Sequence, residues 1–436
     1  MPEVYLAKGT RDFLPAQMRR RLSATDQLRE VFTRFGFEPL DTPAFERIET
    51  LTGKYGDEGQ QLLFKIQKRG EGALRGEVDQ ALRYDLTVPL ARVVAMNPAL
   101  RLPFKRWQIA PVWRADRPAR GRYREFVQCD VDIVGTDSLL AEAECLAVAS
   151  AALTALGFAS FTIKLNDRRI LAAMAQAIGA SGQEGPLLVA VDKLDKIGRD
   201  GVSAELASRG FEPAQIDALW RILDAPAGND ATLAHLEAHL PVPEAVGGLR
   251  SLLGLAESLG IPGDRLRIDP TLARGLDYYT GPVYEIALDE PGMGSVAGGG
   301  RYDGLIGMFA GKRIPAVGIA LGLERLLTVL EERLGAAVER PAAAVLVTVW
   351  DEARQAASLA AVRTLRDAGT PADLYLGELA LKNQLKYANG RGYRHVVVIG
   401  PDEGAAGVVS VKDLASGAQR TLALADLSAA LGTDLA

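Results

Sequence analysis

The chain of 436 residues is poor in the two residue types that most often carry nucleophilic and metal chemistry. It has two cysteines, Cys129 and Cys145, which are too few for a disulfide framework or a cysteine-rich zinc site. None of its three histidines lies in a motif-like stretch, which argues against Ser-His-Asp and Cys-His catalysis. His235 and His239 would share one helix face, but no third ligand is evident. We interpret that face as solvated and predict no metal-binding residues.

Long apolar runs are also missing, because charged residues interrupt the alanine-rich stretches. The N-terminal segment MPEVYLAKGTRDF lacks the apolar core of a signal peptide. We therefore expect a soluble, cytoplasmic protein with no membrane partner. The net charge of −5 and the pI of about 5.5 argue against a surface coated by nucleic acid, but they allow a local basic groove.

One such basic stretch lies between residues 104 and 135, where two predicted strands, Trp107–Trp113 and Phe126–Val134, flank a short loop. Residues 101–125 hold eight Lys or Arg side chains against two acidic ones, a local net charge of +6. A hairpin with this charge repels itself, so we expect an anionic ligand to face it.

The order of predicted elements divides the chain into three regions, and two or three domains suit its length. Up to residue 165 we expect helices and strands, with a polar loop over 53–61. Residues 166–262 favour helices throughout, which predicts a helical insertion before strands resume at 266–268 and 283–288. After a linker predicted over 332–342, strands and helices alternate, which predicts a small α/β domain with a largely parallel sheet.

The glycine-rich segment Gly292–Gly300 only superficially matches a nucleotide-binding loop. Its GMGSVA fits the loose dinucleotide pattern, but further glycines follow where that pattern requires a helix. Gly307–Lys312 is not a Walker A loop either, since the glycine spacing is wrong and Arg313 replaces Ser or Thr. We expect these glycines to let the backbone lie close to a ligand or to a neighbouring strand.

Four blocks are more polar than a half-buried sheet requires. Each combines apolar residues typical of strands with charged residues and tyrosines. Any single block is also explained by Arg–Asp pairs that hold a sheet together. One polar cleft on an antiparallel sheet would explain all four, and we favour that interpretation. The blocks are Leu82–Thr87, Arg114–Asp132, Arg274–Glu285 and Gly298–Arg325.

These residues resemble the motifs of a known family. WRADRP at 113–118 with RYREF at 122–126 resembles the motif 2 hairpin of class II aminoacyl-tRNA synthetases, GLER at 322–325 resembles motif 3, and the strand at 36–43 resembles the end of motif 1. RGLDYYTG at 274–281, GGRYDGL at 299–305 and KGTRD at 8–12 resemble segments specific to the histidyl-tRNA synthetase family. The segments at 166–171 and 191–196 resemble the eukaryotic-type branch.

The resemblance covers nearly the whole chain and implies an α+β fold. It implies a class II catalytic domain over 1–336, with an antiparallel sheet and a helical insertion at about 168–262. It also implies a C-terminal α/β anticodon-binding-like domain over 343–436. A homodimer is expected, because the motif 1 helix and strand of this class pack across a two-fold interface.

The implied reaction joins histidine and ATP into histidyl-adenylate, with Mg²⁺, and then transfers histidine to the 3′ end of tRNA(His). This chemistry needs cations and positioning rather than a protein nucleophile, which suits the shortage of His and Cys. The resemblance implies that Arg274 and Arg114 are catalytic. It implies an ATP site made of Arg114, Asp116, Arg122, Phe126 and Arg325. It implies a histidine site made of Asp85, Thr87, Arg114, Gln128, Asp132, Arg274, Tyr278 and Tyr279.

Two alternatives remain open at this stage. The first is a paralogue that no longer aminoacylates and senses histidine as a regulatory subunit of ATP phosphoribosyltransferase. The C-terminal domain and the intact Arg114, Arg274 and Arg325 disfavour it. The second is another class II synthetase, such as the prolyl, threonyl or glycyl enzyme, which the RGLDYYTG and GGRYDGL segments disfavour.

Overall fold

The computed structural model describes residues 4–273, 278–290, 293–335, 343–378 and 380–435. The chain divides into two compact units. The larger consists of Met1–Asp12 and Arg19–Gly335, and the smaller of Phe13–Met18 and Ala336–Ala436. Within the described residues, no helix combines the length and the apolar character that a membrane span requires.

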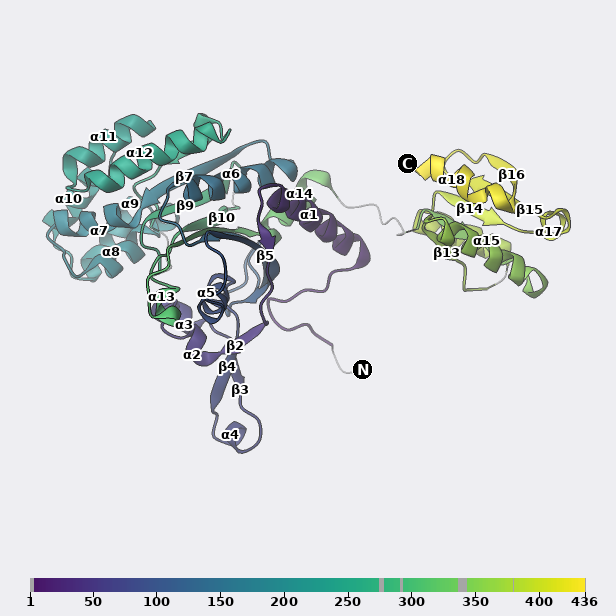
Figure 1. Cartoon of the computed structure of the whole chain (residues 1–436), viewed down its shortest axis with the longest axis horizontal. Helices are drawn as coiled ribbons and strands as arrows, with labels where there is room; N and C mark the ends of the chain where they lie inside the picture. The colour runs from purple at the N-terminus through teal and green to yellow at the C-terminus, as the bar shows by residue number, and fades with distance from the viewer. Residues whose placement is uncertain (1–3, 274–277, 291–292, 336–342, 379, 436) are drawn as a thin grey trace. The chain divides into compact units, whose positions relative to one another are not determined.

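An eight-stranded sheet forms the centre of the larger unit (Figure 1). Its six inner strands run antiparallel, and one short parallel strand joins each edge. The predicted antiparallel sheet is therefore confirmed. The order across the sheet is β1 (Glu38–Pro39), β5 (Phe104–Trp113), β6 (Glu125–Val134), β11 (Ala316–Gly322), β10 (Ser295–Arg301), β9 (Pro282–Leu288), β7 (Phe161–Asp167) and β8 (Leu266–Ile268).

The predicted basic hairpin is the pair β5 and β6, in register from Phe104 opposite Val134 to Trp113 opposite Glu125. Side chains alternate between the two faces of a strand, and β6 uses this alternation to separate two environments. Its odd-numbered residues Cys129, Val131 and Ile133 lie in the main hydrophobic core. The even-numbered residues Gln128, Asp130 and Asp132 are therefore on the opposite, polar face.

Three helices cover the apolar face of this sheet (Figure 1). They are α1 (Pro15–Arg34), α6 (Leu140–Ala155) and α14 (Leu323–Leu334). In α1, Leu28, Val31 and Phe32 are buried at the spacing of one helix face. Helix α14 starts where β11 ends, so the sequence Gly322-Leu323-Glu324-Arg325 forms a strand-to-helix turn, as the run of residues predicted.

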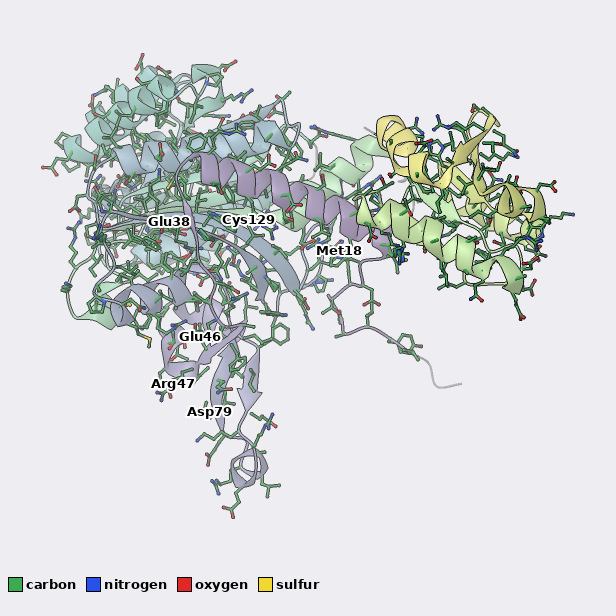
Figure 2. All side chains as sticks on the ribbon, turned by 45° about the vertical axis from the view of Figure 1, so that its right-hand side comes forward. Met18, Glu38, Glu46, Arg47, Asp79 and Cys129 are labelled. Carbon is green, nitrogen blue, oxygen red and sulfur yellow. The ribbon has the colours of Figure 1, made fainter. Side chains whose placement is uncertain are left out.

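A small antiparallel sheet packs beside the polar face and carries a projecting hairpin (Figure 1). It consists of β2 (Phe45–Arg47), β4 (Val78–Leu82) and β3 (Lys65–Gln67); Figure 2 labels Glu46 and Arg47 on β2 and Asp79 on β4. The polar loop predicted over 53–61 is partly wrong, because Gly56–Gln61 forms the short helix α3. The other helices here are α2 (Ile48–Leu51), α4 (Glu71–Leu74), α5 (Thr87–Met96) and, after β10, α13 (Gly307–Ala310).

The segment predicted to be helical is helical between β7 and β8. Its side chains, such as Leu219 and Leu249, belong to the same hydrophobic core as the central sheet. The helices are α7 (Arg168–Ala177), α8 (Glu184–Val191), α9 (Leu194–Ser208), α10 (Pro213–Leu223), α11 (Asn229–His239) and α12 (Pro243–Ser258), followed by a 3-10 turn, η1 (Gly263–Arg265).

The smaller unit has a five-stranded sheet and its own core. Three neighbouring strands are parallel and two are antiparallel, which agrees with the predicted alternation of strands and helices. The strands in order across the sheet are β13 (Ala372–Leu374), β12 (Val345–Val347), β14 (His395–Val398), β15 (Val408–Asp413) and β16 (Gln419–Ala423). The helical segments are η2 (Glu352–Arg354), α15 (Gln355–Asp367), α16 (Leu381–Arg391), α17 (Pro401–Ala406), η3 (Leu424–Asp426) and α18 (Leu427–Leu435).

The linker predicted over 332–342 begins too early. Helix α14 continues to Leu334, so residues 332–334 are helical. Residues 336–342 lie outside the described part of the chain.

Candidate active site

Glycines form the floor of a polar site on the face of the sheet that α1, α6 and α14 leave uncovered. Gly300, Gly318 and Asp132 lie side by side across β10, β11 and β6. A Cβ added to Gly318 would lie 2.0 Å from Oδ1 of Asp132, and one added to Gly299 would lie 2.0 Å from the carbonyl oxygen of Gly318. For Gly299 and Gly300, the expectation of a close approach to a neighbouring strand is confirmed.

Two adjoining cavities are lined in part by this floor. The smaller, of about 250 Å³, lies between the β5–β6 hairpin and the β11–α14 turn. The larger, of about 650 Å³, is lined by the polar face of β6, the turn before α5, two tyrosines and the turn between α8 and α9. Arg114, Gln128 and Arg325 line both cavities, so the two spaces meet at these side chains.

Two guanidinium groups line the smaller cavity, and that of Arg114 lies beside two aromatic rings. The Arg114 guanidinium carbon lies 4.2 Å from the centroid of the Tyr84 ring and 5.2 Å from that of Phe126. Nε of Arg114 donates a hydrogen bond of 3.0 Å to the carbonyl oxygen of Tyr84. Nη1 of Arg325 donates to the carbonyl oxygen of Ser295. The planar cations and the flat ring suit a ligand that combines an aromatic base with phosphate groups.

Three arginines of the hairpin loop have partners within the protein, and one of them, Arg122, also lines both cavities. Arg122 forms an ion pair of 2.7 Å with Asp116, so two predicted ATP contacts hold one another. Nε of Arg124 donates to the backbone oxygen of Asp116 at 3.2 Å, and Arg120 pairs with Glu332 on α14. Part of the loop's positive charge is therefore balanced within the protein.

Asp85 lies buried at the entrance to α5. Its carboxylate accepts hydrogen bonds from the hydroxyl of Tyr55 at 3.1 Å, from the backbone N–H of Val88 at 3.0 Å and from the hydroxyl of Tyr278 at 3.4 Å. Burial raises the pKa of Asp85, while the Val88 hydrogen bond and the charge of Arg114 oppose that rise. The site thus contains a desolvated carboxylate that favours a cationic ligand.

The other residues predicted to bind histidine gather in the same larger cavity. Thr87 is the first residue of α5, and the rings of Tyr278 and Tyr279 pack edge to face with centroids 4.9 Å apart. Nε2 of Gln128 donates to Oδ1 of Asp130 at 3.3 Å. The structure therefore brings Asp85, Thr87, Gln128, Asp132, Tyr278 and Tyr279 to one cavity.

Asp132 is buried at this cavity between two groups that the sequence analysis did not identify. Its carboxylate lies 2.7 Å from Nη2 of Arg106, and its Oδ1 accepts from the hydroxyl of Tyr302. Burial raises the pKa of Asp132, whereas Arg106 lowers it. The sequence offered one signal for this cluster. Asp130 and Asp132 are charged residues two positions apart in an otherwise apolar strand, so they face the same side of it.

Arg274, predicted to be catalytic and to bind histidine, lies outside the described residues, since 274–277 are not among them.

No group of three or more His, Cys, Asp or Glu side chains in the described ranges is arranged to hold a metal ion. Nε2 of His235 lies 3.1 Å from the carbonyl oxygen of Arg221, and its ring stacks 4.2 Å from that of His239.

The antiparallel sheet, the basic hairpin that forms two of its strands and the strand-to-helix turn bearing Arg325 together define a class II aminoacyl-tRNA synthetase. The family model described as histidyl-tRNA synthetase matches residues 9–326, and the model described as anticodon binding domain matches residues 343–433. The chain belongs to the histidyl-tRNA synthetase family.

Known relatives are similar along almost the whole chain. A histidine–tRNA ligase from Cytophaga hutchinsonii is 43% identical over 441 residues, covering 96% of this chain and 97% of the relative. One from Gloeobacter violaceus is 42% identical over 456 residues, covering 98% and 97%. The crystal structure of histidyl-tRNA synthetase from Nostoc sp. PCC 7120 superimposes with a TM-score of 0.82 at 33% identity, covering 100% of both chains.

These comparisons confirm the predicted family and fold class, and they do not favour the regulatory paralogue. The assignment to the eukaryotic-type branch stays a prediction, as do the domain boundaries and the roles of the individual site residues.

Proposed function

We propose that this chain is a histidine–tRNA ligase. In the first step, a carboxylate oxygen of histidine attacks the α-phosphorus of ATP, the bond to the bridging oxygen breaks and pyrophosphate leaves. In the second, a ribose hydroxyl at the 3′ end of tRNA(His) attacks the acyl carbon of histidyl-adenylate, and AMP leaves. The observation that carries this proposal is the meeting of an arginine- and aromatic-lined cavity with a carboxylate- and tyrosine-lined one at Arg114.

For the ATP half of the site, we assign the base to the smaller cavity. Phe126 would stack on one face of the adenine and Arg325 would lie on the other. Asp116 would accept from the adenine amino group, and Arg122 would contact the phosphates once it leaves the Asp116 carboxylate. Arg114 would hold the α-phosphate and the attacking carboxylate together, which its position in the lining of both cavities supports. Arg274 would stabilise charge on the α-phosphoryl group from the opposite side.

For the histidine half, we assign the α-ammonium group to Asp85, Thr87 and Gln128, because Asp85 is a buried carboxylate beside this cavity. We assign the imidazole to Asp132, with Tyr278 and Tyr279 beside it. An imidazole has two ring nitrogens to satisfy. A site that bonds both of them rejects apolar amino acids strongly, because its own polar groups would be left unpaired.

We further propose that the protein uses Mg²⁺ with ATP, forms a homodimer and is cytoplasmic. Glu285 lines the larger cavity, and its carboxylate oxygen atoms are of the kind that Mg²⁺ prefers. When bound, the ion would neutralise phosphate charge, while few protein ligands are needed because ATP supplies most of the oxygens. The anticodon-binding family of the C-terminal region supports tRNA as the partner.

The experiment is ATP–pyrophosphate exchange measured with each amino acid in turn, followed by charging of tRNA(His). Exchange is expected with histidine and not with proline, threonine or glycine. Arg274→Ala and Arg114→Ala should each lose exchange while remaining folded. Arg250→Ala, which removes an exposed arginine paired with Glu237 on the insertion, is the matched control and should keep it. A wild-type enzyme that shows no exchange with histidine would overturn the proposal.

A further inference from the structure

The most deeply buried cation near the site is Arg106, which the proposed reaction does not use. Its side chain is fully buried, although it lies in the middle of β5. In the hairpin register Arg106 is directly opposite Asp132, and its Nη2 lies 2.7 Å from that carboxylate and 4.0 Å from Asp130. Asp130 and Asp132 both line the larger cavity and share the Arg106 guanidinium, which does not line this cavity.

The same guanidinium also contacts the turn that precedes α5. Its Nη2 donates a hydrogen bond of 3.2 Å to the carbonyl oxygen of Leu86. Leu86 lies between Asp85 and Thr87, the residues assigned to the α-ammonium group of histidine. Arg106 thus connects the turn that would hold the amino group with the strand that would hold the imidazole.

This ion cluster is not complete by itself. In the described part of the chain, Nε and Nη1 of Arg106 are buried without hydrogen bonds, and Oδ2 of Asp132 has only its ion pair with Nη2 of Arg106 at 2.7 Å. Burial raises the pKa of Asp130 as well as that of Asp132, and Arg106 opposes both rises. Apolar residues of similar volume often stabilise a fold as well as a buried ion cluster does. An unsatisfied cluster of this kind is costly, so its position beside a ligand cavity points to a role in binding.

We propose that Arg106 is a positioning residue for histidine, which orients the Asp132 and Asp130 carboxylates at the cavity and sets their distance from the Asp85–Thr87 turn. The proposal rests on the proposed function, since it assumes that histidine occupies the larger cavity. Arg106 acts through these groups and touches neither substrate. Its loss should therefore affect histidine binding more than ATP binding.

The test compares Arg106→Met, Arg106→Lys and the double variant Arg106→Met/Asp130→Asn in histidine-dependent ATP–pyrophosphate exchange. Arg106→Met should raise KM for histidine about 10- to 100-fold, as expected when a binding group is displaced. KM for ATP should stay within about 2-fold, because the ATP contacts are unchanged. Arg106→Lys, which keeps the charge, should fall between Arg106→Met and the wild type. The double variant should recover part of the loss, because it removes one carboxylate together with its counter-charge.

Lys105→Met is the matched control. Lys105 immediately precedes Arg106 on β5 and pairs with Glu144 on α6 at 2.6 Å, away from the cavities, so its loss should leave both KM values unchanged. Folding of every variant is checked by urea denaturation. If Arg106→Met does not fold, Arg106→Lys and the double variant decide: a raised KM for histidine supports the proposal, and an unchanged one overturns it.

The outcomes separate this inference from the proposed function. Wild-type enzyme without histidine-dependent exchange would overturn the proposed function, and this inference with it. Wild-type exchange with histidine, combined with a folded Arg106 variant whose two KM values are unchanged or rise equally, would overturn the inference alone.

Discussion

At the scale of single residues, Gly318 shows how tightly the floor of the site is packed. A Cβ at this position would lie 2.0 Å from Oδ1 of Asp132 and 3.0 Å from the carbonyl oxygen of Val131. Backbone and a buried carboxylate cannot both move away, so the added methyl group must displace Asp132. We expect Gly318→Ala to raise KM for histidine by about 10-fold or more, measured by ATP–pyrophosphate exchange.

The control for this prediction is Gly254→Ala. Gly254 lies exposed on α12, and a Cβ there meets no atom within 4 Å. Alanine is a better helix former than glycine, so this variant should be slightly stabilised and should keep its KM for histidine. An unchanged KM in Gly318→Ala would show that the Asp132 carboxylate tolerates displacement.

The buried carboxylate of Asp85 leads to a pH dependence. Its pKa is raised by burial, so it takes up a proton at a higher pH than an ordinary aspartate does. In the proposed site, the ammonium group of histidine would bind only the ionised form of Asp85. KM for histidine should therefore rise as the pH falls, beginning above the ordinary aspartate pKa of about 3.9. Steady-state KM for histidine, measured across the acidic range, checks this expectation.

Histidine itself also titrates, so its effect on the pH dependence of KM has to be distinguished from that of Asp85. The imidazole of free histidine titrates with a pKa of about 6.5, and it does so equally for every variant. The comparison is with Asp85→Asn, which cannot ionise at this position. Its KM for histidine should be high and should depend less on pH. The same acid limb in both enzymes would assign the effect to histidine or to another carboxylate.

At the scale of elements, one buried ion pair joins β10 to α6. Arg301 contacts Glu142 through Nε at 2.5 Å and through Nη2 at 2.7 Å. Glu142 is fully buried, so removing the arginine would leave an uncompensated charge inside the protein. Arg301 also donates to the backbone oxygen of Thr136, which holds the segment that leads into α6.

We expect Arg301→Ala to lower the free energy of unfolding by about 3–5 kcal/mol, measured by urea denaturation. Arg301→Met/Glu142→Leu should recover most of this loss, because it removes both charges and keeps the volume. Arg333→Ala breaks the exposed pair with Glu290 and should cost no more than about 1 kcal/mol. Equal losses in Arg301→Ala and Arg333→Ala would contradict this account.

At the scale of the whole molecule, the N-terminal segment presents apolar side chains to solvent. Val4 is 92% exposed, Tyr5 77% and Leu6 56%. Exposed apolar groups of this kind are typical of surfaces that a partner covers. We expect a homodimer, so sedimentation equilibrium should give twice the chain mass of 46.6 kDa. A monomer with full activity would contradict this prediction.

Local sequence patterns were sufficient for most of the elements. The two strands of the basic hairpin were predicted at Trp107–Trp113 and Phe126–Val134 and extend by only a few residues in the structure. Alternation of side chains and the loop-forming Pro118 and Gly121 are local properties, which explains this success. Helix α3 was missed, because its six residues are two glycines and four polar side chains, which favour a loop.

The residues of the candidate site also fall into two groups, those that the sequence identified and those that only the fold brings together. Motif resemblance named Asp132 and Tyr279, and the structure places both at one cavity. The sequence analysis assigned no role to Arg106, Asp130 or Tyr302. Arg106 and Tyr302 are distinguished only by a neighbour in space, whereas Asp130 stands two positions before Asp132 on the same strand. Tyr302 lies 170 positions from Asp132 in the chain, and only the folded sheet brings its hydroxyl to that carboxylate.

The sequence by itself determined the family, the antiparallel sheet, the helical insertion and the charge of the hairpin, because these depend on motifs, on periodicity and on composition. The tertiary structure alone decided the strand register. That register places Arg106 and Gly318 on either side of Asp132, from β5 and β11. A shift of one residue would turn every one of these side chains to the other face. Burial around Asp85 and Asp132, and the resulting rise in their pKa, follows from that packing.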